Sequence, residues 1–279
     1  MASLSIDKYK GHINDFLFGP VNPLYASIFR ICLSLIIIIV FLLHHAKVGF
    51  YLITDHAYDS LYQKIFLTRA YLIISFVISI LFGVGYYPRL FGFILSVLLF
   101  PLIFIFGYHV SRQILLFTLI AFSTVQSDMR LSIRKNSSKI NSDSGPIWPI
   151  RLIQIQLSVL YGINAIAKTY PEYLSGKVLE GMSMVAPNFL VNLSDGYLHI
   201  GALAIPVFLL AISSALTEYI LAIGFWFRRT RIPTAILGLT FHLVLMKIMT
   251  IGFLDWAAMF LYLAFLLPFE IPSNKNKGL

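Results

Sequence analysis

The feature that most constrains this chain is a series of long apolar stretches that follow one another between residues 24 and 271. A helix needs about 20 apolar residues to cross the hydrocarbon core of a bilayer, and most of the stretches approach or exceed that length. Hydrophobic residues make up 58% of the chain and charged residues 12%, with a mean hydropathy of +0.84, which excludes an ordinary soluble domain. The sequence therefore predicts an all-α, polytopic integral membrane protein in contact with the lipid bilayer.

The apolar stretches predict a bundle of about seven to eight membrane helices. The fourth stretch is short and begins beside Arg112, so we interpret it as a buried or tilted half-span. Residues 169–197 are half apolar and rich in Gly, Pro and Met, which favours a segment that lies on the membrane surface or re-enters the protein. We expect a single transmembrane domain over 1–279 and no soluble C-terminal domain. The stretches are 24–43, 70–87, 89–107, 113–126, 150–167, 198–226, 231–247 and 249–271.

The distribution of basic residues predicts the orientation of the helices. When both termini are placed inside, most of the 21 Lys and Arg residues fall in inner loops, as the positive-inside rule requires. The excess over the 12 acidic residues then reflects membrane topology, and we expect no nucleic-acid partner. The polar N-terminus lacks the order of a cleavable signal, so the first span is expected to remain as an anchor. These features indicate a multi-pass protein with both termini inside, and we expect its membrane to be the bacterial cytoplasmic membrane.

Several classes of chemistry are disfavoured by motifs that the sequence lacks. The seven histidines include one adjacent pair, His44 and His45, whose side chains would point about 100° apart on a helix. Histidines three to five residues apart, as in H-E-x-x-H, are not found, and we expect no metal site. Phosphate-binding glycine loops and nucleophile elbows are also missing, which disfavours nucleotide-driven transport and α/β-hydrolase chemistry.

Polar residues inside the apolar stretches are the candidates for function, because each needs a partner, a cavity or a route to the interface. Tyr161, Asn164 and Lys168 are spaced by three and four residues, so they share one helix face, which Gln154 and Leu157 continue. Two interpretations remain open. The stripe could join helices by hydrogen bonds while Lys168 extends to the interface, or an apolar pocket could make Lys168 a general base. The full set is Arg30, His109, Arg112, Gln154, Gln156, Asn164, Lys168, Glu218, His242, Lys247 and Asp255.

Five segments resemble, in order and spacing, the transmembrane part of vitamin K-dependent gamma-glutamyl carboxylase and its bacterial relatives, the horizontally transferred transmembrane domain (HTTM) family. NPLYASIFRI is similar to the family's first-helix entry, and GYHVSRQILLF to the segment with its buried histidine. IWPIRLIQIQLSVLYGINAIAK resembles, without a gap, the stretch that ends at its essential lysine. FRRTR and FHLVLMKIMTIGF resemble its arginine and Phe-His motifs.

The resemblance implies a role for each aligned residue. Lys168 takes the place of the general base that deprotonates a reduced quinone, a vitamin K-like hydroquinone, and His109 takes the place of the histidine that assists it or stabilises the oxyanion. In the family, the hydroquinone anion reacts with oxygen to give a base strong enough to remove a carbon-bound proton. The residues expected to line the substrate pocket are Tyr161, Gln156, Asn164, His242 and Trp148.

Departures from the family pattern leave alternatives open. Thr169 stands where the carboxylase has a second lysine, Tyr173 where it has a tryptophan, and Leu245 where it has an asparagine. His242 could also be an interior histidine bonded to a backbone carbonyl. We interpret the chain as a quinol-type or carboxylase-like enzyme, a lyase or quinol-dependent oxygenase, acting on an apolar or peptide substrate. The alternative is a non-enzymatic component for maturation, export or immunity of a secreted peptide, with that peptide or another protein as partner. A third possibility, a small-solute transporter, is not supported because the sequence shows no inverted repeat.

Overall fold

The computed structural model of the protein is predominantly helical, as expected, and its contacts divide it into two compact units. The first unit comprises Met1–Ile153 and Leu267–Leu279, and the second comprises Gln154–Leu266. Side chains of 44–54, 69, 102–105, 110–112 and 253–255 are not described. The residues whose backbone is described are 11, 13–54, 69–105, 110–133, 145–185, 189–193, 195–200, 202–249 and 253–270.

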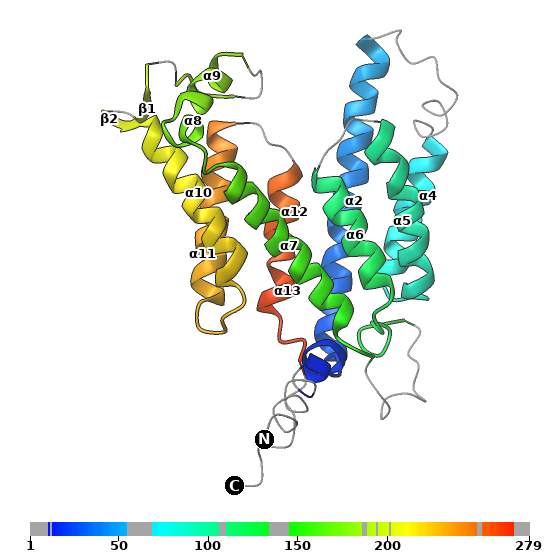
Figure 1. The fold of residues 1–279 in the computed structure, drawn as a ribbon. Coiled ribbons are helices and arrows are strands. Elements are labelled where there is room, and N and C mark those ends of the chain that lie inside the picture. The colour runs from blue at the N-terminus through cyan, green and yellow to red at the C-terminus, as the bar shows by residue number, and fades with distance from the viewer. Residues whose placement is uncertain are drawn as a thin grey trace, which may run out of the picture. The chain divides into compact units, whose positions relative to one another are not determined.

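The first unit is a set of helices packed in chain order. Helix α2 packs against α4, α4 against α5, and α5 against α6 (Figure 1). Helix α6 has 14 described residues, which at about 1.5 Å per residue is shorter than the bilayer core. The helices are α2 (Pro23–Thr54), α4 (Arg69–Gly83), α5 (Pro88–Ile105), α6 (Val110–Ser123) and the start of α7 (Trp148–Ala167).

A fully buried arginine, Arg30 on α2, holds this unit together. Its Nε donates to the carbonyl of Gly83 at the end of α4, at 3.2 Å, and its two terminal nitrogens donate to the carbonyls of Ser127 and Leu131. Carbonyls at and beyond helix ends lack donors within the helix, and a buried guanidinium needs acceptors. The guanidinium of Arg30 and these three carbonyls therefore satisfy each other's hydrogen-bonding needs. Gly85 reverses the chain after α4 with φ of +79°, a conformation that glycine adopts at little cost.

The second unit is built around α10 and α11, which are neighbours in sequence and in space. Helices α8 and α9 and strand β2 pack against α10 (Figure 1). The two strands form an antiparallel hairpin in which Leu198 pairs with Ile205. After the later part of α7, the elements are α8 (Pro171–Leu174), α9 (Lys177–Val185), β1 (Tyr197–Ile200), β2 (Leu203–Pro206), α10 (Val207–Gly224), α11 (Arg231–Ile248), α12 (Phe253–Leu261) and α13 (Leu263–Leu266).

The chain from the end of α7 to α9 runs antiparallel along α10. A Cβ at Gly162 would lie 3.9 Å from the Cβ of Ala222, and further on Lys168 bonds Glu218 and Tyr173 bonds Ser214. At the start of α10, a Cβ at Gly176 would lie 2.8 Å from the backbone nitrogen of Phe208. Residues later in this segment thus contact residues earlier in α10. Lys168 consequently lies beside the C-terminal half of α10, away from the end at which α10 begins.

A close approach between α11 and α12–α13 depends on Gly238. A Cβ at this position would overlap the hydroxyl of Tyr262 and lie 2.7 Å from Cδ2 of Leu221. Tyr262 is 3% exposed and sits in the link between α12 and α13, so its ring packs directly on the glycine. Any larger residue would have to displace a buried aromatic side chain.

Two of the predicted spans differ from the observed elements. The first part of the expected span 198–226 contains the strands Tyr197–Ile200 and Leu203–Pro206, and α10 begins only after Pro206. Proline has no backbone N–H to donate, so it is favoured before or at the first turn of a helix. The all-α expectation missed this hairpin. The last expected span is divided into α12 and α13 at Tyr262. Four helical stretches in the described residues are long and apolar enough to cross a membrane: Pro23–Leu43, Trp148–Ala167, Val207–Gly224 and Arg231–Ile248.

Replacing Gly238 by alanine should destabilise the second unit by about 1–3 kcal/mol, because the added methyl group displaces the Tyr262 hydroxyl from its hydrogen bond. The measurement is the unfolding midpoint of the purified protein in detergent. Gly162→Ala is the matched control, since its methyl group meets only Ala222 at an ordinary contact distance of 3.9 Å. Equal stability of the two variants would contradict the packing of Tyr262 on Gly238.

Candidate functional site

Three buried side chains from three parts of the second unit form a hydrogen-bonded network. The hydroxyl of Tyr161 on α7 lies 2.8 Å from Nε2 of His242 on α11 and 2.8 Å from the hydroxyl of Tyr262. All three residues are at most 5% exposed. Buried polar groups need hydrogen-bond partners, and here the Tyr161 hydroxyl pairs with both His242 and Tyr262. The structure thus brings together two residues that the sequence had assigned to one site, Tyr161 and His242.

The network is held in place by aromatic packing and by hydrogen bonds between helices. Phe225, at the end of α10, packs against the rings of Tyr262 and Phe265, with centroids 4.8 Å apart in each case. Gln154 on α7 donates from Nε2 to the carbonyl of Ala264 at 2.6 Å. These contacts fix α7 against α13 and the end of α10. Gln154 therefore has the helix-joining role that was one of the two interpretations of the polar stripe.

Lys168 reaches a carboxylate on α10. Its Nζ donates to Oε1 of Glu218 at 2.9 Å, and the two side chains are 24% and 6% exposed. Glu218 lies in the C-terminal half of α10, away from the end that contacts α8 and α9. The pairing neutralises both charges where water is largely excluded. The apolar pocket expected around an unpaired Lys168 is thus replaced by a salt bridge with Glu218.

The surroundings of the salt bridge are aromatic and hydroxylic. The Nζ of Lys168 lies 5.7 Å from the centre of the Tyr173 ring, a distance at which a cation and an aromatic ring attract each other. The hydroxyl of Tyr173 lies 3.0 Å from Oγ of Ser214, one turn before Glu218 on α10. On the other side, His242 lies within electrostatic range of the Glu218 carboxylate. The salt bridge therefore lies near the Tyr161 network, of which His242 is a member.

The other predicted site residues are placed differently. Gln156 is half-buried on α7, and Trp148 is half-buried in the part of α7 that belongs to the first unit. The side chain of Asn164 is exposed, although the polar stripe was expected to face the interior. At about 100° per residue, Asn164 points about 60° away from Tyr161. His109 lies outside the described residues.

Two members of the site were not predicted as site residues. Glu218 was recognised only as a polar residue in an apolar stretch, and Tyr262 was not singled out at all. Lys168 needs a partner of opposite charge, and Glu218 is a carboxylate inside an apolar stretch. That combination is a sequence signal that could have selected Glu218. Within the described residues, no group of three or more His, Cys, Asp or Glu side chains could hold a metal ion.

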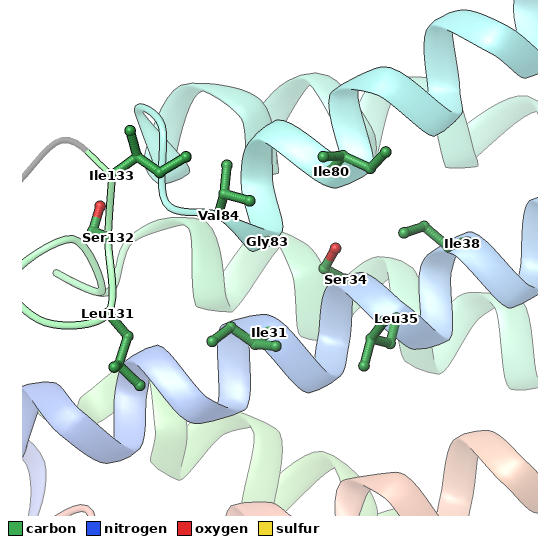
Figure 2. Close-up of a pocket in the computed structure, with 10 residues that line it drawn as sticks. All are labelled: Ile31, Ser34, Leu35, Ile38, Ile80, Gly83, Val84, Leu131, Ser132 and Ile133. Carbon is green, nitrogen blue, oxygen red and sulfur yellow. The ribbon is translucent and has the colours of Figure 1, made fainter.

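A separate cavity of about 480 Å³ lies in the first unit (Figure 2). It is lined by α2, by the end of α4 and the residue after it, and by residues 131–133. Figure 2 shows aliphatic side chains around it, with the hydroxyl-bearing side chains of Ser34 and Ser132 among them. None of the described lining residues is ionisable, and most of them are aliphatic.

A family model described as the HTTM domain matches residues 18–268. No match was found among curated proteins or among solved structures. The matched range includes every residue of the Tyr161 network and of the Lys168–Glu218 salt bridge. The domain is a membrane domain related to the carboxylase, in agreement with the motif order in the sequence. The chain therefore belongs to the HTTM family and is an integral membrane protein.

Proposed function

We propose that this protein is a membrane enzyme of the quinol-dependent, carboxylase-like type, in which Lys168 accepts a proton from a hydroxyl of a bound quinol. The observation that carries the proposal is the salt bridge between Lys168 and Glu218, with a Glu218 side chain that is 6% exposed, near a buried tyrosine network that includes His242. A purely structural lysine near a helix end would extend to the interface, where its hydration costs nothing.

The residues present fit a reduced quinone. Its ring is flat and apolar, which suits the rings of Tyr173 and Tyr161, and its two hydroxyls need acceptors such as the carboxylate of Glu218. When bound, such a molecule supplies a hydroxyl whose anion reacts with oxygen. The role of this chain is then to hold the ring, exclude water and receive the proton.

Lys168 and Glu218 together can manage that proton. In water an ammonium and a carboxylate are each well hydrated, but in apolar surroundings both lose hydration, so the neutral amine and acid become competitive with the ion pair. Once the ligand is bound, the ammonium of Lys168 passes one proton to Oε1 of Glu218, and the neutral amine of Lys168 is then free to accept another. The O–H bond of the ligand breaks, an N–H bond forms at Lys168, and the negative charge left on the ligand oxygen faces the new ammonium. His109, by its place in the family motif, is proposed to stabilise the same charge.

The architecture around this site is proposed to be a single transmembrane domain of about seven to eight membrane helices, in which the segment 169–197 enters the protein beside α10. Tyr173, packed along α10 and bonded to Ser214, supports the entry of that segment. Both termini are placed inside, in the bacterial cytoplasmic membrane. Gln156 and Trp148 are proposed to line the substrate path, and a small secreted peptide is a candidate second substrate.

Lys168→Met should reduce quinol-dependent oxygen consumption by about a hundredfold or more, because it removes the proton acceptor. The measurement uses the purified full chain in lipid nanodiscs with duroquinol as the reductant, after subtraction of uncatalysed oxidation. Lys177→Met is the matched control, since Lys177 is an exposed lysine at the start of α9.

Activity of Lys168→Met equal to that of the wild type would contradict the role of this residue. No oxygen consumption by folded wild-type protein would contradict the enzyme itself. The non-enzymatic component for maturation, export or immunity of a secreted peptide would then be the better account.

Cysteines at the two ends of α10 should react from opposite sides of the membrane. In a Cys32→Ser background, Ser175→Cys is expected to react with an impermeant maleimide in intact cells, and Thr230→Cys only after permeabilisation. Both positions are exposed, and they lie beyond opposite ends of α10. The chain has one cysteine, so the background has no other thiol. The reverse pattern would contradict inside termini, and labelling of both from one side would contradict a membrane-spanning α10.

A further inference from the structure

Three buried side-chain polar atoms in the described residues have no hydrogen-bond partner, and one of them belongs to an ionisable group. Two are the hydroxyls of Ser75 and Thr118, and the third is Oε2 of Glu218. The Glu218 side chain is 6% exposed, and its other oxygen, Oε1, accepts from Lys168. One half of this carboxylate is therefore satisfied and the other is not.

An unsatisfied carboxylate oxygen is unusual in a protein interior. Buried polar atoms are paired in the great majority of cases, and leaving a charged acceptor without a donor costs more than leaving a neutral hydroxyl. The neighbouring polar side chains do not fill the position: the Tyr161 hydroxyl bonds His242 and Tyr262, and Tyr173 bonds Ser214. Oε2 thus marks an acceptor position that a donor from outside the chain would satisfy.

We propose that Glu218 is the specificity-determining residue of this site, with Oε2 accepting a hydrogen bond from a neutral hydroxyl of the ligand. The site then selects the reduced, hydroxyl-bearing form of its ligand over the oxidised form. This rests on the proposed quinol function and deepens it by naming the ligand form and the atom that recognises it.

The geometry of the carboxylate links this recognition to Lys168. Both oxygens belong to one rigid group, and Lys168 Nζ donates to Oε1 at 2.9 Å, so a hydroxyl bound at Oε2 shares its carboxylate with Lys168. The carboxylate that selects the hydroxyl therefore also connects it to Lys168. His242, within electrostatic range of Glu218, lies on the side of the Tyr161 network.

The selectivity follows from the donor and acceptor inventory. A quinol offers an O–H donor to Oε2, whereas a quinone offers only carbonyl oxygens, which are acceptors and would face another acceptor. A carboxylate ligand would add like-charge repulsion to the same mismatch. Hydrogen bonds to charged groups are stronger than neutral ones, so the preference for the quinol should be about ten- to a hundredfold.

The experiment measures this preference by equilibrium binding under anaerobic conditions, with the wild-type chain in lipid nanodiscs. The probes are duroquinol, duroquinone and the dimethyl ether of duroquinol, which keeps the ring but has no donor. The wild type is expected to bind duroquinol about ten- to a hundredfold more tightly than either of the others. Glu218→Gln can keep an oxygen toward Lys168 while replacing the free acceptor by an amide donor, so its preference should vanish or reverse. Glu172→Gln, at an exposed position on α8, is the matched control and should keep the wild-type preference.

The outcomes separate this inference from the function on which it rests. Equal wild-type affinity for duroquinol and its dimethyl ether would overturn the inference, even if Glu218→Gln failed to fold. A folded Glu218→Gln protein that kept the full preference would overturn it as well. Failure of wild-type protein to bind any of the three probes would contradict the proposed quinol function, and this inference with it.

Discussion

A charge enclosed by apolar helices must find a partner, and this constraint shapes both units of the protein. Arg30 meets it with backbone carbonyls, and in doing so ties α2 to the end of α4 and to the 127–131 segment. Lys168 meets it with the side chain of Glu218. The two solutions differ in consequence. An arginine surrounded by carbonyls cannot give up its proton, whereas a lysine paired with a carboxylate can exchange one.

The antiparallel course of residues 162–176 along α10 is what brings the lysine and the carboxylate together. Gly176 allows this segment to approach the start of α10 closely, and Tyr173 fixes its register along α10 through Ser214. Had the chain turned outward after α7, Lys168 would have reached water. Instead it bonds Glu218 on α10, whose carboxylate lies within electrostatic range of His242 in the Tyr161 network.

The sequence predicted the helical class and the family, because apolar length and motif order are local properties. It also singled out Lys168, Tyr161 and His242 as site candidates, and the last two proved to be bonded to each other. It could not reveal that Glu218 partners Lys168 or that Tyr262 completes the network, since those contacts join residues far apart in the chain. Helical spacing placed Asn164 on the interior face, yet its side chain is exposed because it lies at the edge of that face. The hairpin at 197–206 was missed because an apolar run of that length fits a helix or a strand.

The central claim is that Lys168 and Glu218 form an interacting pair inside the protein, and a double-mutant cycle on the free energy of unfolding tests it most directly. Lys168→Met and Glu218→Gln are each compared with the wild type and with the double variant in the same detergent. Because either single change leaves a buried group without its partner, the double variant should be more stable than the sum of the single effects by about 1–3 kcal/mol. Additive effects, with a coupling energy near zero, would show that the two side chains do not interact and would contradict the account.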